Sequence, residues 1–224
     1  MSSQEAFKII CDMINQQLEG NDDPSQVEQL SLDLVNIGVV SQELKQKIEE
    51  YSNLESLSLT GCQLRSLENF PKLDRLMRLE LIDNKLGGNS LQELKEYKSL
   101  QSLSLGGNNI KQVDDLAFIR DLPNLFQLDL LNNEINNIEN YRETIFKEFP
   151  QLGILDNQDQ KGQEIAYGDT TDQEDDEEEE YEEEEEQGNE GDQKDGGEDY
   201  GANNDQQQEE GGDYGENPQK KVHI

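Results

Sequence analysis

Leucines recur at one fixed spacing through the middle of this chain, and that spacing limits what the chain can fold into. Each group has leucines at its first, fourth and sixth positions and ends in a polar break. Glycine and asparagine in these breaks, as at 106–107 and 132–133, exclude one long amphipathic helix. The pattern therefore predicts a series of similar short units. The four groups are Leu54, Leu57 and Leu59; Leu76, Leu79 and Leu81; Leu100, Leu103 and Leu105; and Leu125, Leu128 and Leu130.

Successive groups begin 22, 24 and 25 residues apart, which fits the leucine-rich repeat template. In that template the leucines at alternating strand positions point into the core, and an Asn amide binds the backbone of the turn that follows. A degenerate fifth unit with Val27, Leu30 and Leu32 comes first. We predict an α/β fold, a right-handed leucine-rich repeat solenoid with a curved parallel sheet. The Asn or Cys positions of the template hold Cys62, Asn84, Asn108 and Asn133.

Both ends of such a solenoid need caps, because each unit buries its apolar face only against its neighbours. Residues 3–19 predict an amphipathic capping helix that Gly20 and Pro24 end. Residues 140–149 predict a closing helix, and residues 150–156 predict a last strand-like segment. The expected organisation is an N-terminal capping helix over 1–24, repeats over 25–139, a C-terminal cap over 140–156 and a disordered acidic tail over 157–224.

The connections between the strands are expected to differ. Residues 90–97 predict a helix in which Ser90 is the N-cap and Glu93 completes a capping box, with Leu91 and Leu94 on one face. The other connections predict short turns.

The charge of the chain is concentrated in its last third. The formal net charge is -34, of which residues 157–224 carry -22 and residues 1–156 carry -12. Low hydrophobicity combined with high net charge predicts disorder for residues 157–224. The densest part, from 174 to 186, is acidic at every position except Tyr181. We expect this block to bind a basic partner; the alternative is a solubilising segment with no partner. Its carboxylates belong to Glu174, Asp175, Asp176, Glu177, Glu178, Glu179, Glu180, Glu182, Glu183, Glu184, Glu185 and Glu186.

This charge restricts the classes of partner. It repels nucleic acids and anionic membranes, and it attracts basic proteins in a way that salt weakens. Two cysteines and the absence of a signal-peptide pattern or a long apolar run lead us to expect an intracellular, soluble protein. We expect a monomer that binds no nucleic acid directly and contacts no membrane.

No catalytic constellation is visible. The single histidine is His223, and neither metal-ligand spacing nor a phosphate-binding loop occurs. We therefore expect a protein that is not an enzyme and has no cofactor or metal. Thr171, which precedes Asp172 and Glu174, is a candidate phosphorylation site.

The outward strand positions of the repeats form a candidate docking face, since the concave side of a solenoid is its usual binding surface. The alternative for each of these residues is an ordinary solvated strand position. The candidates are Gln29, Ser31, Ser56, Ser58, Arg78, Glu80, Ser102, Ser104, Gln127 and Asp129.

A family resemblance rests on the segment after the repeats. It contains 141–143 (Tyr-Arg-Glu), Phe146, 149–152 (Phe-Pro-Gln-Leu) and 155–156 (Leu-Asp), and an acidic tail follows it. This combination resembles the acidic leucine-rich nuclear phosphoprotein 32 family, as do residues 67–73 and 79–84. The resemblance covers residues 25–156 in detail and the tail in character only. It implies histone binding and chromatin modulation, with links to phosphatase inhibition, histone acetylation, RNA export and apoptosis.

We expect a non-catalytic histone-binding protein of the chaperone type, in which the tail shields basic surfaces and the repeats add docking. The alternative is a protein phosphatase inhibitor or a regulatory scaffold that binds one protein through its repeats. A third hypothesis, a splicing-type repeat protein, is disfavoured because the acidic tail opposes RNA contact. Family members carry a basic import cluster where this chain has only Lys220 and Lys221. We therefore expect nuclear and cytoplasmic residence with a weak import signal.

Overall fold

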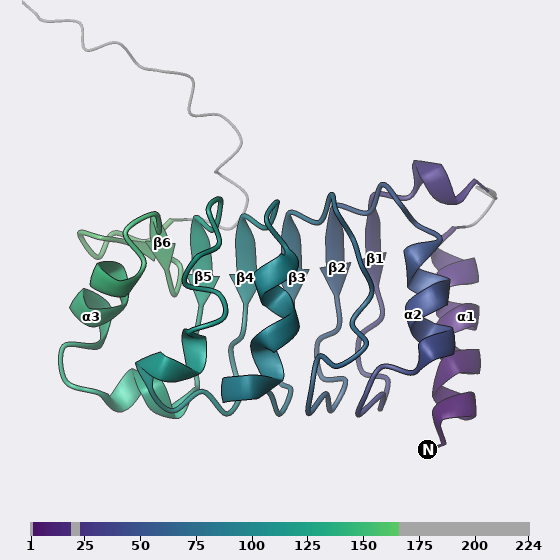
Figure 1. Cartoon of the computed structure of the whole chain (residues 1–224), viewed down its shortest axis with the longest axis horizontal. Helices are drawn as coiled ribbons and strands as arrows, with labels where there is room; N and C mark the ends of the chain where they lie inside the picture. Colours follow the sequence, from purple (N-terminus) through teal and green to yellow (C-terminus); the bar gives the residue numbers. More distant parts are fainter. Residues whose placement is uncertain (1, 19–22, 166–224) are drawn as a thin grey trace, which may run out of the picture. The chain divides into compact units, whose positions relative to one another are not determined.

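Each leucine group forms a short strand, and the strands stack side by side in chain order (Figure 1). The computed structural model describes residues 2–18 and 23–165, so the acidic block and Thr171 lie outside the described residues. Strands β1 to β6 are parallel, and β7 pairs antiparallel with β6. The predicted leucine-rich repeat solenoid is confirmed. The strands are β1 (Gln29–Ser31), β2 (Ser56–Ser58), β3 (Arg78–Glu80), β4 (Ser102–Ser104), β5 (Gln127–Asp129), β6 (Ile154–Leu155) and β7 (Gln158–Asp159).

The strand register places equivalent leucines directly beside one another. The middle residue of each strand from β1 to β5 pairs with the middle residue of the next, as Leu57 does with Leu79. All of these leucines are buried, as is Leu155 at the end of the row. Burying one leucine side chain contributes about 1.5–3 kcal/mol relative to leaving it exposed. The repeated stack is therefore the core of the solenoid.

Helix α1 (Ser3–Gln17) covers the β1 end of the sheet (Figure 1). Ser2 and Glu5 form a capping box, and Ala6, Ile10 and Ile14 are buried. The Gln17 side chain acts as a substitute strand: its Nε2 donates to the carbonyl of Ser31 at 2.5 Å, and its Oε1 accepts from the amide of Ser31 at 2.9 Å. Satisfying the edge of β1 in this way prevents another strand from pairing there. The helix ends two residues before the predicted limit.

The connections contain more helix than the sequence predicted. Helix α2 (Gln42–Glu49) occupies a connection predicted as a turn; Ser41 caps it, and Leu44 and Ile48 are buried. Only two of its eight residues are buried, so its apolar signal was weak. The connection between β2 and β3 contains only turns. The other connections contain the 3-10 helices η1 (Pro24–Gln26), η2 (Gly88–Glu96), η3 (Val113–Leu116) and η4 (Glu134–Asn137).

The helix predicted at 90–97 is present, but its start was predicted wrongly. It is the 3-10 helix η2, which begins at Gly88. Ser90 therefore lies inside the helix, and its hydroxyl oxygen accepts from the amide of Gly87 at 2.7 Å. Gly88 has a φ of +52°, a conformation that favours glycine and allows the earlier start. Leu91 and Leu94 are buried, as predicted.

The far end of the solenoid is closed by helix α3 (Tyr141–Glu148), followed by β6 and β7. Ile145 and Phe149 are buried against the last repeat. The chain is still paired beyond β7, since the amide of Ile165 donates to the carbonyl of Asn157 at 2.8 Å. The expected boundary at 156 thus falls inside the hairpin between β6 and β7.

Candidate partner-binding surface

An asparagine ladder holds the repeats in register beneath the candidate surface. The Asn108 side chain accepts from the amide of Leu86 at 3.0 Å and donates to the carbonyls of Leu81 at 2.8 Å and Leu105 at 2.9 Å. Asn84 and Asn133 make equivalent bonds. Each asparagine side chain thus links its own repeat to the preceding one. The sequence predicted instead that it binds the turn that follows. The side-chain amides of these three buried asparagines all have hydrogen-bond partners, and these bonds stabilise the sheet under the candidate surface.

All ten predicted docking residues lie on β1 to β5, at the outward positions of the sheet. They form two rows along the register, one with the first and one with the last residue of each strand. The central part of the face differs from a solvated surface, because Ser102 is 7%, Ser104 1% and Gln127 9% exposed. Small serine side chains on β4 lie between longer side chains on β3 and β5, which shield them.

The β1–β2 side of this face is organised by Asp33, which the sequence analysis missed. Its Oδ1 accepts from the Ser58 hydroxyl at 2.6 Å and from the Thr60 amide at 2.7 Å. Its Oδ2 accepts from the Ser31 hydroxyl at 2.8 Å. Two of the predicted docking serines are therefore engaged within the protein.

The β5–β6 side carries two half-buried carboxylates. Asp129 Oδ1 accepts from the amide of Leu131 at 2.9 Å. Asp156 Oδ1 accepts from the amide of Leu130 at 2.8 Å, and its Oδ2 accepts from the Tyr141 hydroxyl at 2.9 Å. Burial raises the pKa of both carboxyl groups, and the negative charge of Asp156 raises the pKa of Asp129 further. This side of the face is therefore acidic and only partly solvated.

Two apolar side chains at the ends of β5 were also missed. Phe126 directly precedes the strand and Leu131 follows it by two residues, and each is 43% exposed. The Phe126 ring lies over Gly153, where an added Cβ atom would meet the ring at 2.1 Å. The only sequence signal was a large apolar residue outside the buried positions of the repeat.

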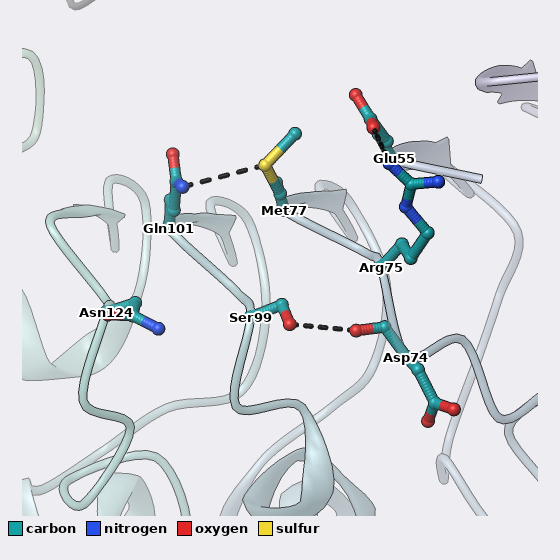
Figure 2. Close-up of a pocket in the computed structure, with 7 residues that line it drawn as sticks. All are labelled: Glu55, Asp74, Arg75, Met77, Ser99, Gln101 and Asn124. Atoms are coloured by element: carbon teal, nitrogen blue, oxygen red, sulfur yellow. Dashed lines mark hydrogen bonds and ion pairs between the residues drawn. The ribbon is translucent and has the colours of Figure 1, made fainter. Parts of the chain in front are cut away.

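A shallow cavity of about 320 Å³ lies at the side of the sheet where β2 to β5 begin (Figure 2). Several of its polar groups hold neighbouring repeats together. The Ser99 hydroxyl donates to the carbonyl of Asp74 at 2.8 Å, and the Asn124 amide group donates to the carbonyl of Lys98 at 2.8 Å. The cavity thus belongs chiefly to a second ladder between repeats. Its lining residues are Glu55, Asp74, Arg75, Met77, Ser99, Gln101 and Asn124.

The described residues contain no metal-holding cluster, and the thiol of Cys62 is not activated. Within residues 2–18 and 23–165 there is no group of three or more His, Cys, Asp or Glu side chains placed to hold a metal ion. Burial raises the pKa of the Cys62 thiol to about 11, which keeps it protonated at neutral pH. Within the same residues, the helices are too short or too polar to span a membrane.

Comparison with known proteins identifies the repeat class. A family model described as leucine-rich repeat matches residues 28–179. The chain belongs to this leucine-rich repeat family. Internalin C2 from Listeria monocytogenes has a similar fold, with a TM-score of 0.50 and 21% identity over 66% of this chain and 62% of that chain.

The curated relatives confirm the resemblance noted in the sequence. The acidic leucine-rich nuclear phosphoprotein 32-related protein 1 of Caenorhabditis elegans is 37% identical over 64% of this chain and 62% of its own length. Acidic leucine-rich nuclear phosphoprotein 32 family member A of Drosophila melanogaster is 37% identical over 52% of this chain and 44% of its length. A protein of Tetrahymena thermophila that is named as a histone is 36% identical over 71% of this chain and 41% of its length. The match thus covers less than two thirds of each relative.

Proposed function

We propose that this leucine-rich repeat protein is a non-catalytic, histone-binding regulator of chromatin that acts as a chaperone. The observation that carries the proposal is the charge of -22 on residues 157–224, joined to a capped repeat domain. Histones are strongly basic, and an acidic chain neutralises them without sequence-specific contacts. One exposed ion pair contributes only about 0.2–1 kcal/mol, so the affinity must come from many pairs acting together.

The two parts of the chain have different roles in this proposal. The acidic block at 174–186 supplies affinity that salt weakens, because exposed charges are screened. The concave face supplies selection among basic proteins. The relative named as a histone and the two named as nuclear phosphoproteins support a histone-associated role in the nucleus. With only Lys220 and Lys221 as a basic cluster, we propose residence in both nucleus and cytoplasm.

The experiment compares the full chain with a full-length variant whose 12 carboxylates between 174 and 186 are replaced by the corresponding amides. The affinity for core histone dimers is measured at physiological and at high salt. We expect a large loss of affinity for the variant at physiological salt and a much smaller difference at high salt. Equal affinities at physiological salt would disprove the role of the block.

A regulatory scaffold, including a protein phosphatase inhibitor, is the second candidate. It is favoured by Phe126 and Leu131, since apolar contacts at these exposed side chains do not weaken with salt. Affinity capture from cell extract at two salt concentrations separates the two functions. A scaffold keeps one specific partner at high salt and in the amide variant, whereas a histone chaperone loses its partners in both cases.

A further inference from the structure

The turns that follow strands β1 to β5 share one backbone feature. Each has a residue in the left-handed conformation four positions after the middle of its strand, with a φ between +55° and +69°. The amides of the first four donate to the next repeat, as that of Leu34 does to the carbonyl of Thr60 at 2.8 Å. The five residues therefore stack in one row along the solenoid. They are Leu34, Gly61, Asp83, Gly107 and Asn132.

Leu34 is the member of this row whose residue type the conformation disfavours. Glycine, asparagine and aspartate adopt a positive φ readily, whereas a branched apolar residue does so at a cost in stability. The side chain of Leu34 is 81% exposed, so its burial offsets little of that cost. A strained side chain that the core does not need indicates a role outside folding.

Leu34 and Asp83 project from the row in the same way. An added Cβ atom on Gly61 would lie 2.7 Å from Cδ2 of Leu34, and one on Gly107 would overlap Oδ1 of Asp83. Each of the two side chains thus lies against the glycine of the next repeat, and the two glycines leave room for them. We call Leu34 and Asp83 the turn ridge.

The turn ridge combines an apolar side chain with an available carboxylate. Among the residues that the structure describes, no hydrogen bond or ion pair engages the carboxylate of Asp83. Asp33 directly precedes Leu34, and its carboxylate is held by the Ser58 hydroxyl at 2.6 Å and the Thr60 amide at 2.7 Å. Acidic groups thus flank the exposed leucine, which favours a partner with positive charge.

We propose that the turn ridge docks a basic helix of a partner protein, in which an apolar side chain contacts Leu34 and a Lys or Arg side chain contacts Asp83. The inference deepens the proposed function and rests on it: the helix belongs to the basic partner that the tail attracts.

The spacing within the turn ridge favours a helix over an extended segment. Leu34 and Asp83 are two repeats apart, which is roughly 10 Å at the spacing of neighbouring strands. Two turns of a helix rise about 11 Å, so residues seven apart on one face match this distance. An extended segment presents residues of one face at roughly 7 or 13 Å, and neither distance fits as well.

The turn ridge would add a selection that the tail lacks. A flexible run of carboxylates responds mainly to charge and its spacing. The turn ridge responds in addition to where an apolar side chain lies relative to a basic one. Two basic helices of equal charge would thus be distinguished.

The test uses the full chain and two alanine-rich helical peptides of identical composition, each with a fluorescent label. Both carry two arginines on one face. In the first peptide a leucine lies on that face, seven residues from an arginine, and in the second the leucine lies on the opposite face. At high salt, which screens the attraction of the tail, we expect the wild type to bind the first peptide about tenfold more tightly.

Two variants assign this preference to the turn ridge. Leu34→Asn should remove the preference, because asparagine accepts the left-handed conformation and lacks the apolar contact. Asp83→Asn should weaken binding of the first peptide about threefold at physiological salt, since it removes one exposed charge pair.

Urea unfolding of Leu34→Asn separates a binding role from a structural one. Asparagine occupies the equivalent position of the last repeat, at Asn132, so the replacement should relieve strain and raise the unfolding midpoint. A leucine that serves the fold would give a lower midpoint when replaced, and that result would contradict the inference.

Matched controls remove comparable groups elsewhere. Val39→Ala removes methyl groups from an apolar side chain that is 44% exposed, and Asp114→Asn removes an exposed carboxylate on η3. Both should leave the two affinities unchanged.

Three binding results would overturn the inference. They are equal affinities of the wild type for the two peptides, a preference that Leu34→Asn retains, and a dimer in sedimentation that Leu34→Asn dissolves, which would show that a second copy of this chain covers the turn ridge. If the preference is absent while core histone dimers still depend on the acidic block, only this inference fails. If the turn ridge distinguishes the peptides but the wild type binds no histone, the proposed function fails and the partner is another basic protein.

Discussion

The hydroxyl of Tyr141 donates to Oδ2 of Asp156 over 2.9 Å, and this bond joins the closing helix to the last parallel strand. The other oxygen of Asp156 accepts from the amide of Leu130. In the earlier repeats that position is filled by a main-chain carbonyl, as when the amide of Leu105 donates to the carbonyl of Asp129. Asp156 has a φ of +53° as the chain turns into the hairpin, and its carboxylate takes over the role of the carbonyl.

Tyr141→Phe should therefore loosen the C-terminal cap. It removes the hydrogen bond to a half-buried carboxylate, and we expect a loss of about 1–3 kcal/mol in the free energy of unfolding. Urea unfolding of Tyr141→Phe, Asp156→Asn and the double variant measures the coupling between the two side chains. Additive losses in this cycle would show that the bond does not couple the helix to the strand.

Asn108→Ala should destabilise the protein far more than a surface change. The side chain is 8% exposed and makes four hydrogen bonds to the backbone, which no alanine can replace. We expect a loss of about 3 kcal/mol or more in unfolding free energy. Asn109→Ala is the matched control, because the side chain of Asn109 is next in sequence and exposed. This variant should change the unfolding midpoint little. Similar midpoints for the two variants would contradict the ladder's role.

The pH dependence of stability should reflect Asp129. Its folded pKa is raised by burial, so the folded state binds more protons than the unfolded state between the unfolded and folded pKa values. The stabilisation from protonation is present below that window and is lost as the pH rises through the folded pKa. The wild type should therefore gain stability relative to Asp129→Asn as the pH falls from neutral to about 4. Urea unfolding at several pH values measures this difference, and a constant difference would contradict the raised pKa.

Gly153→Ala should move the Phe126 ring rather than unfold the chain. An added Cβ atom would meet the ring at 2.1 Å, but the ring is 43% exposed and can rotate toward solvent. We expect a loss of no more than about 1 kcal/mol, together with changed NMR shifts of the ring. In the Phe126→Ala background the same change should cost almost nothing. An equal cost in both backgrounds would show that the ring is not the obstacle.

The sequence allowed the solenoid to be predicted because its signal is repeated. The pleat of a strand points alternate residues to opposite sides, so the regularly spaced leucines point inward. The first and last residues of each strand from β1 to β5 therefore point outward, and their positions could be predicted. Helix α2 was missed because Leu44 and Ile48 are its only buried residues. The fold beyond 156 was missed because hydrogen bonds from Arg142, and not apolar spacing, hold it: the guanidinium donates to the carbonyls of Leu155 and Asp159 at 3.1 and 2.7 Å.

The candidate surface was less predictable than the fold. Whether Ser102 or Ser104 is accessible depends on the size of side chains on two neighbouring strands, which no single repeat encodes. The exposure of Phe126 depends on Gly153, which lies 27 residues later and contributes only the absence of a side chain. Such relations between distant residues decide the chemistry of a surface, while periodic patterns decide the framework.

The most direct test of the proposed function is competition between this protein and DNA for histones. Core histone dimers are bound to DNA at low salt, increasing amounts of the full chain are added, and the free DNA is followed on a native gel. We predict that the wild type releases the DNA without any nucleotide cofactor, and that the variant with amides between 174 and 186 does so far less. DNA that stays bound to histones at every concentration of the wild type would contradict the proposed function.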